Sequence, residues 1–175
     1  MLPADYLVVD FFEVPYARLG ELEKAASATK FGLRPDSEPL DSMLKSLTRP
    51  APSLAEVDPY FLPLLALLDD TGVCPSEVPA YTDLLCDLVE LHGGAWTIVE
   101  RSRDLLARLD SELFREDALR AFWNRHFESV PDAAGGMLQA LARLRNVIAA
   151  LRPETFLLIR IPAVDQSGAA VPAID

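Results

Sequence analysis

The clearest β-strand in the chain is predicted for YLVVDFFEV, Tyr6 to Val14, which is rich in β-branched and aromatic residues and stops at Pro15. A second strand is predicted near the other end of the sequence, for TFLLIRIP, Thr155 to Pro162. Two strands alone make a marginal sheet, so a third strand makes the arrangement physically easier. A third strand is therefore expected between these two.

The third strand is predicted at Ala95 to Glu100, directly after the Gly93-Gly94 break. Its side chains alternate as in a strand, but Ile98 and the apolar residues that follow also fit the spacing of one helix face. We favour a short strand that leads into a helix from Ser102, because the additional strand stabilises the sheet.

Most of the sequence between the outer strands has helical spacing. Ser53 and Glu56 form a capping box and Asp58-Pro59 a second helix start, and that element ends at Gly72. Three further helices are predicted at Ser76 to His92, Ala118 to Phe127, and after Asp132 along an apolar stripe from Met137 to Leu151. The sequence thus predicts a single α+β domain, residues 1–162, in which about five helices cover a small three-stranded sheet, and a mobile tail, residues 163–175.

Composition and charge narrow the kinds of partner that suit the chain. The net charge is −11 at pH 7, which argues against nucleic acids and anionic membranes because both repel a negative surface. Met1 to Asp5 lack the features of a signal peptide, and the longest apolar run, Phe61 to Leu68, is too short to span a bilayer. We therefore expect a cytoplasmic protein in which Cys74 and Cys86 are free thiols. Its 13 arginines against 3 lysines resemble the composition of proteins from GC-rich bacterial genomes.

The most specific feature is a long stretch without basic residues. No lysine or arginine lies between Arg49 and Arg101, whereas this stretch, the acidic window, carries nine carboxylates: Glu56, Asp58, Asp69, Asp70, Glu77, Asp83, Asp87, Glu90 and Glu100. Residues 1–92 hold 16 acids against 6 bases, and residues 93–175 hold 11 against 10, so the imbalance belongs to the first part. Such carboxylates are solvated, neutralised from elsewhere in the fold, or offered to a cationic partner.

Two interpretations of the acidic window compete with a plain solvated face. In the first, a negative surface steers and docks a basic protein partner through Asp69, Asp70, Asp83, Asp87 and Glu90. In the second, the acidic helices pack beside helices that carry arginine, namely Arg101, Arg108 and Arg115, which recur every seven residues, and Arg120, Arg125, Arg143 and Arg145.

Asp70-Thr71-Gly72 resembles the active-site triplet of aspartic proteases. Those enzymes need two facing copies in an all-β fold, so that two carboxylates share one proton. Here the triplet occurs once and follows the run Leu64 to Leu68, which has helical character. A helix that ends at a glycine explains the same residues, and we favour that interpretation.

Both histidines and the aromatic cluster have structural explanations. His92 falls inside the apolar arc of its predicted helix, at the last turn. Phe122, Trp123, His126 and Phe127 share one helix face, which is typical of core packing. In the alternative, Trp123 anchors a protein partner, so it joins the candidate partner-binding residues.

No catalytic, metal or cofactor site is indicated by the sequence. Cys86 and His92 lie on one predicted helix but point about 120° apart, so they do not form a nucleophile and base pair. The Gly-x-Ser-x-Gly elbow, a phosphate-binding glycine loop and the His-Glu-x-x-His pair are all absent from the sequence.

The order of the predicted elements resembles one bacterial family. A strand and helices, then Gly93-Gly94 with the strand Ala95 to Val99, then helices and a closing helix-strand unit from Leu138 to Ile161, are similar to the order in the YfbM-like family. The resemblance covers mainly the second half of the chain. It implies an α+β fold and no particular activity or functional residue.

We therefore expect a non-enzymatic, acidic, cytoplasmic binding protein, such as an immunity or inhibitor protein that masks a basic toxin or nuclease. One alternative is a small hydrolase in which His92 or His126 meets two carboxylates only in the folded chain. Another is an interaction subunit of a larger assembly with Trp123 at the contact. Light scattering on the purified chain gives its oligomeric state and tests the last alternative.

Overall fold

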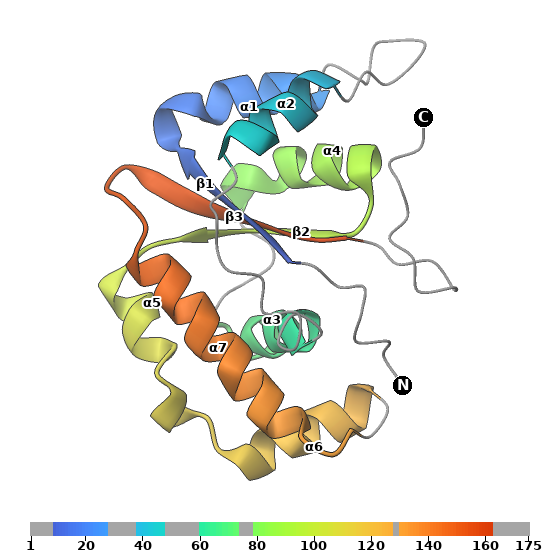
Figure 1. The fold of residues 1–175 in the computed structure, drawn as a ribbon, viewed down its shortest axis with the longest axis vertical. Helices are drawn as coiled ribbons and strands as arrows, with labels where there is room; N and C mark the ends of the chain where they lie inside the picture. Colours follow the sequence, from blue (N-terminus) through green and yellow to red (C-terminus); the bar gives the residue numbers. More distant parts are fainter. Residues whose placement is uncertain (1–8, 28–37, 48–59, 74–78, 128–129, 163–175) are drawn as a thin grey trace.

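A three-stranded sheet lies between two sets of helices (Figure 1). The computed structural model describes residues 9–27, 38–47, 60–73, 79–127 and 130–162. Within these residues the strands are β1 (Asp10–Pro15), β2 (Ala95–Glu100) and β3 (Thr155–Ile161). The described helices are α1 (Leu19–Ser27), α2 (Glu38–Leu47), α3 (Phe61–Asp70), α4 (Thr82–His92), α5 (Arg103–Arg108), α6 (Glu116–His126) and α7 (Ala133–Ala149).

β3, the last of these strands in the sequence, lies in the centre of the sheet. The strand order is β1-β3-β2, and both neighbours run antiparallel to β3, so Leu158 has Phe12 on one side and Ile98 on the other. All residues of β3 except Arg160 are buried. Because its apolar side chains alternate between the two faces of the sheet, both faces need a covering layer.

One face of the sheet is covered by α1, α2 and α4, as Figure 1 shows. A single core cluster on this side contains Phe12, Val14, Ile98, Phe156 and Leu158 of the sheet together with Leu22 of α1, Leu44 of α2 and Leu88 of α4. The rings of Phe12 and Trp96 stack across the sheet with centroids 6.2 Å apart.

The opposite face is covered by α3 and α7. A second core cluster contains Phe11, Val99, Leu157 and Ile159 of the sheet, Phe61 and Leu64 of α3, and Leu141 and Leu144 of α7. Arg143 of α7 is buried within this layer, and its guanidinium carbon lies 5.2 Å from the ring centre of Phe11 and 5.5 Å from that of Phe61. Both distances suit a cation-π contact, which stabilises the buried charge.

α6 packs across α7 in a smaller cluster of its own. Trp123, only 1% exposed, lies there with Ala133 and Met137. Gly136 allows the close approach of a further ring, because a Cβ atom at this position would lie 2.4 Å from ring atoms of Tyr60. The ring centroids of Tyr60 and Trp123 are 5.4 Å apart. Small residues in the first turns of α7 thus make room for large aromatic neighbours.

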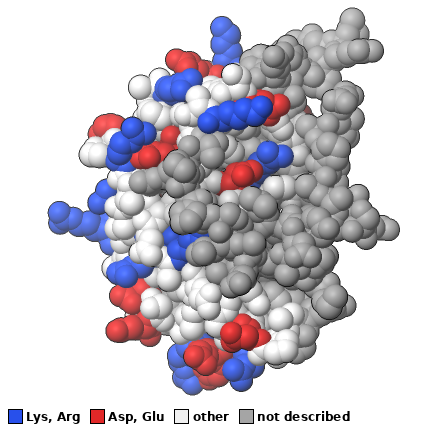
Figure 2. Space-filling view, viewed as in Figure 1, with Lys and Arg blue, Asp and Glu red and all other residues white. Residues whose placement is uncertain are grey.

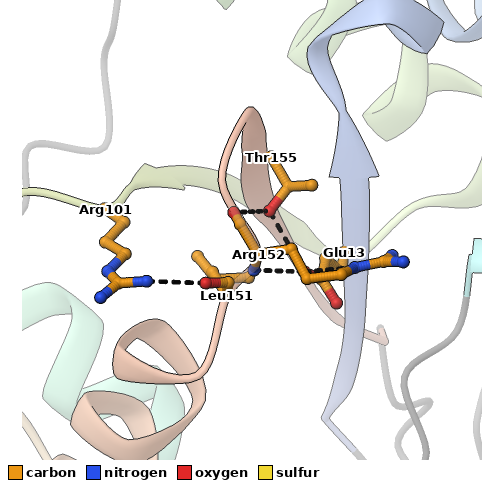
Figure 3. Close-up of polar contacts among 5 residues, drawn as sticks. All are labelled: Glu13, Arg101, Leu151, Arg152 and Thr155. Carbon is orange, nitrogen blue, oxygen red and sulfur yellow. Dashed lines mark hydrogen bonds and ion pairs between the residues drawn. The ribbon is translucent and has the colours of Figure 1, made fainter.

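A buried carboxylate ties β1 to the turn that enters β3 (Figure 3). Glu13 Oε1 accepts hydrogen bonds from the main-chain N–H of Arg152 at 2.7 Å and from its Nε at 3.2 Å. The Thr155 hydroxyl lies 3.2 Å from the same oxygen and 2.8 Å from the carbonyl oxygen of Arg152, so its single proton serves one acceptor at a time. Burial alone would raise the pKa of Glu13, but the bonds from Arg152 and Thr155 hold the pKa below its ordinary value of 4.5.

The predicted α+β class and its three-stranded sheet are confirmed. β2 spans Ala95–Glu100 as expected, β3 ends at Ile161, and β1 begins at Asp10, while residues 6–8 lie outside the described residues. Ser102 does begin a helix, since its Oγ accepts a hydrogen bond from the N–H of Leu105 at 2.9 Å.

The helix count was underestimated. Seven α-helices occur in the described residues instead of about five, because the pattern did not predict α1 and α2. The capping box at Ser53 and Glu56, the helix start at Asp58-Pro59, the cap at Ser76 and the tail at 163–175 all lie outside the described residues. No helix in the described part of the chain is long and apolar enough to cross a membrane.

Replacing Glu13 with Gln should destabilise the protein by about 1–3 kcal/mol at pH 7, because charge-assisted hydrogen bonds are lost and a buried amide N–H₂ replaces an acceptor. The lowered pKa of Glu13 stabilises the fold at pH values above its ordinary pKa of 4.5, and this contribution is lost as the pH falls through the lower pKa of the folded state. Urea unfolding of wild type and variant at pH 7 and at pH 4 gives the difference in unfolding free energy at each pH. The exposed Glu112→Gln change is the control, and equal stability of the two variants at pH 7 would contradict the role of Glu13.

Candidate functional site

The described acids of the acidic window do not form one cluster. Asp69 and Asp70 end α3 on one side of the sheet, whereas Asp83 and Glu90 lie on α4 on the other side (Figure 1). All four residues are exposed. The acids at 56, 58 and 77 lie outside the described residues. The predicted recognition surface is therefore divided between two layers of the fold.

α4 presents an exposed face that combines acidic and apolar side chains. Asp83, Cys86, Val89 and Glu90, which we call the α4 face, lie on the exposed side of this helix, and Val89 is 43% exposed. Their spacing of three, six and seven residues from Asp83 places them on one arc of the helix. The sequence pattern identified the two acids but missed Cys86 and Val89, although the same spacing connects all four.

Two of the predicted partner-binding residues are buried. Asp87 is 7% exposed and Trp123 is 1% exposed. Asp87 is rotated by about 40° from Asp83, toward the side of α4 that buries Leu84 and Leu88. Neither Asp87 nor Trp123 can therefore belong to an exposed recognition surface, which corrects the prediction for these two residues. Trp123 packs in the core, as expected for the aromatic face of its helix.

Arg101 and Arg108 bind main-chain oxygens, and neither pairs with an acid of the window that lies in the described residues. Arg101 Nη1 donates to the carbonyl oxygen of Leu151 at 2.7 Å (Figure 3), and Arg108 Nη2 donates to that of Gly72 at 2.9 Å. α5 ends at Arg108, so the repeat of Arg101, Arg108 and Arg115 does not lie on one helix.

Other arginines pair with acids of their own part of the chain. Arg115 pairs with Asp117 at 2.7 Å and Arg145 with Asp110 at 3.6 Å. On the face shown in Figure 2, basic and acidic side chains are interspersed, and neither sign forms a continuous patch. Within the described ranges, no ion pair is formed by Asp70, Asp83 or Glu90. Neutralisation by the protein's own described arginines therefore does not apply to these three acids.

His92 is buried at the end of α4. Its ring centroid lies 5.9 Å from that of Trp96, and its Nε2 atom lies 3.6 Å from Oδ1 of Asp41. Burial is the main cause that lowers the pKa of His92 below 6.5; Asp41 raises it and Arg160 lowers it further. His92 is therefore a neutral residue at pH 7, and its burial agrees with its place in the apolar arc of the predicted helix.

The remaining groups of catalytic type do not come together. His126 is exposed at the end of α6, where its ring packs on Phe122 at 4.7 Å, and no described carboxylate lies within hydrogen-bonding distance. Cys86 is a free, exposed cysteine, while Cys74 lies outside the described residues. The described residues contain no group of three or more His, Cys, Asp or Glu side chains that could hold a metal ion.

The Asp70-Thr71-Gly72 triplet forms the end of α3. Thr71 Oγ1 donates to the carbonyl oxygen of Leu67 at 2.8 Å, and the N–H of Gly72 donates to that of Asp69 at 2.8 Å. Gly72 has φ 64°, a left-handed conformation that glycine adopts without strain. The predicted helix end at this glycine is confirmed, and a protease turn is not what these residues form.

Tyr81 anchors the start of α4 to the end of β2. Its hydroxyl donates to Glu100 Oε1 at 2.6 Å, and its ring packs on Phe156 with centroids 5.8 Å apart. Burial is the main cause that raises the pKa of Tyr81, and the hydrogen bond and charge of Glu100 raise it further. The pKa of Tyr16 is raised by burial and by Glu100 as well. Glu100 is thus an acid of the window that has an internal partner.

No protein-family model, curated protein or solved structure matches the chain. The resemblance to the YfbM-like family stays a prediction, and the functional assignment depends on the geometry of the α4 face.

Native protein should ionise fewer than its four tyrosines near pH 10, because Tyr16 and Tyr81 retain their protons to higher pH. Their raised pKa values stabilise the fold below about pH 10, and this contribution is lost above it, where the unfolded chain releases protons first. Phenolate absorbance during an alkaline titration measures the effect, with urea-unfolded protein as the reference.

In the native titration, the Tyr81→Phe variant should lose part of the phenolate absorbance that appears above pH 10. In urea, its total absorbance change should fall by that of one tyrosine with an ordinary pKa. Ionisation of all four tyrosines near pH 10 in the folded wild type would contradict the contact between Tyr81 and Glu100.

Proposed function

We propose that the chain is a non-enzymatic cytoplasmic binding protein, of the immunity or inhibitor kind, that docks a basic protein such as a toxin or nuclease on the α4 face. The observation that carries the proposal is the pair Asp83 and Glu90. Both carboxylates are exposed on one helix face, and no described residue supplies them with a cation.

The composition of the α4 face suits a protein contact. Asp83 and Glu90 lie along one edge of the α4 face, about 20° apart around the helix, and Cys86 and Val89 lie beside them toward the other edge. The carboxylates attract a basic partner over a distance and accelerate association, while the apolar side of the face loses its contact with water in the complex. A partner that carries lysine or arginine beside a small apolar group complements this arrangement.

The α4 face is held in place at both ends of the helix. At the start, Tyr81 is hydrogen-bonded to Glu100. At the end, Gly93 caps the helix at φ 63°, and Trp96 Nε1 donates to the Gly93 carbonyl oxygen at 3.0 Å. α4 also packs on α1 and β2. A surface that is already ordered before binding avoids the entropic cost of ordering it in the complex, which favours affinity.

The Asp83→Lys, Glu90→Lys double variant should bind a fluorescent peptide rich in Lys and Arg roughly tenfold more weakly than wild type at low salt, because two attractive charges become repulsive. The dependence of affinity on salt should also become shallower. Fluorescence anisotropy at several salt concentrations measures both quantities.

The matched control is Asp104→Lys, Glu112→Lys, which changes the net charge equally at two exposed positions outside α4. It should retain most of the peptide affinity. An equal loss in both double variants would mean that only net charge matters, and an unchanged affinity in the α4 variant would exclude the α4 face as the docking surface.

A further inference from the structure

An apolar pocket lies where the end of α3, the end of α5 and the start of α6 meet. Its volume is about 380 Å³, within the range of about 300–1,000 Å³ for small-molecule sites. The apolar part of its lining consists of Leu67, Val73, Leu113, Phe114 and Leu119, with Ala118. The pocket is open to solvent on one side, so a ligand can enter it without any movement of the described residues.

Three polar side chains also line this pocket, and two of them are already engaged. The Thr71 hydroxyl donates its proton to the Leu67 carbonyl oxygen at 2.8 Å. Arg115 binds Asp117 through two hydrogen bonds, from Nε at 3.1 Å and from Nη2 at 2.7 Å. The charge of Arg115 is therefore compensated by Asp117, and the Thr71 hydroxyl has no proton left to donate.

Arg108 is the third polar side chain, and it differs from Arg115 in its partners. Its Nη2 atom donates to the Gly72 carbonyl oxygen at 2.9 Å, which holds the guanidinium at the pocket wall. No carboxylate of the described residues pairs with Arg108. A guanidinium has five N–H donors, so several remain for an anion beside the apolar lining.

We propose that this pocket binds an aliphatic carboxylate, of the class of a medium-chain fatty acid. Its hydrocarbon chain lies against Leu67, Phe114 and Leu119, and its carboxylate accepts hydrogen bonds from Arg108. The site is separate from the α4 face, because α4 covers the other side of the sheet.

The chemistry of the lining selects this class over others. A cationic amphiphile is repelled by Arg108, and a neutral alcohol gains the apolar contact without the charge-assisted hydrogen bonds. A multiply charged phosphate needs several free cations, whereas Arg115 is already neutralised by Asp117. Among the described residues, one guanidinium without a carboxylate partner lies beside this apolar cavity, and it matches a single carboxylate on an apolar chain.

Calorimetric titration of the full chain with decanoate, below its micelle concentration, tests the proposal, with decanol as the uncharged probe. Wild type should bind both ligands, decanoate more tightly. Arg108→Gln should weaken decanoate about tenfold and leave decanol unchanged, because only the charged contact is lost. Ala118→Phe should remove the binding of both, since the added ring fills the pocket.

Arg120→Gln and Ala121→Phe are the matched controls on α6, because both residues are exposed and neither lines the pocket. Both variants should bind the two ligands as wild type does. The proposal is overturned if wild type does not bind decanoate, if Ala118→Phe binds it normally while folded by circular dichroism, or if Arg108→Gln weakens both ligands equally. Loss of peptide binding in the α4 variant has no bearing on this result.

Discussion

Every layer of the fold depends on β3 being paired along both of its edges. This strand joins β1 to β2, and its side chains supply the centre of two separate apolar clusters. Its side chains alternate between the two faces, so Phe156 and Leu158 pack against helices on one side of the sheet and Leu157 and Ile159 against helices on the other. The polar contacts collect at the strand's ends: Glu13 binds the turn before it, and Arg160 near its end lies 3.9 Å from Asp10 and 5.5 Å from the ring centre of Trp96. The middle of the sheet is left to apolar packing, which gives a rigid support for α4.

The charged side chains of this fold differ in which groups surround them and balance their charge. Two buried charges have defined environments: Glu13 accepts hydrogen bonds, and Arg143 lies over two aromatic rings. Several arginines in the second half bind carbonyl oxygens or nearby acids, and none of the described arginines pairs with Asp83 or Glu90. Asp83 and Glu90 consequently remain exposed beside Val89, which is a consequence of the fold and not of composition alone. Arg108 likewise has no carboxylate partner among the described residues. It is a cation that a carbonyl oxygen holds next to an apolar pocket.

The local chemistry of the sequence predicts the strands, the helix that begins after Ser102 and the helix end at Gly72. β2 was identified by its glycines and alternation, and the end of α3 by Gly72, because such signals act within a few residues. α2 was overlooked, although Leu40, Met43, Leu44 and Leu47 have helical spacing and are buried. The burial of Asp87 and Trp123 depends on which elements pack beside α4 and α6, and a single helix pattern does not contain that information. The pocket could not be predicted for the same reason, since its walls combine residues 67–73 with residues 108–119.

The position of β3 also affects how this molecule is made. A ribosome releases β1 first and β2 much later, yet neither has its sheet partner until residues 155–161 have emerged. Helices can form early, but β1 has no strand beside it until most of the chain is made, and such pairing between distant segments is slow. Apolar strands that wait for a distant partner favour aggregation, which is the hazard that chaperones limit during folding.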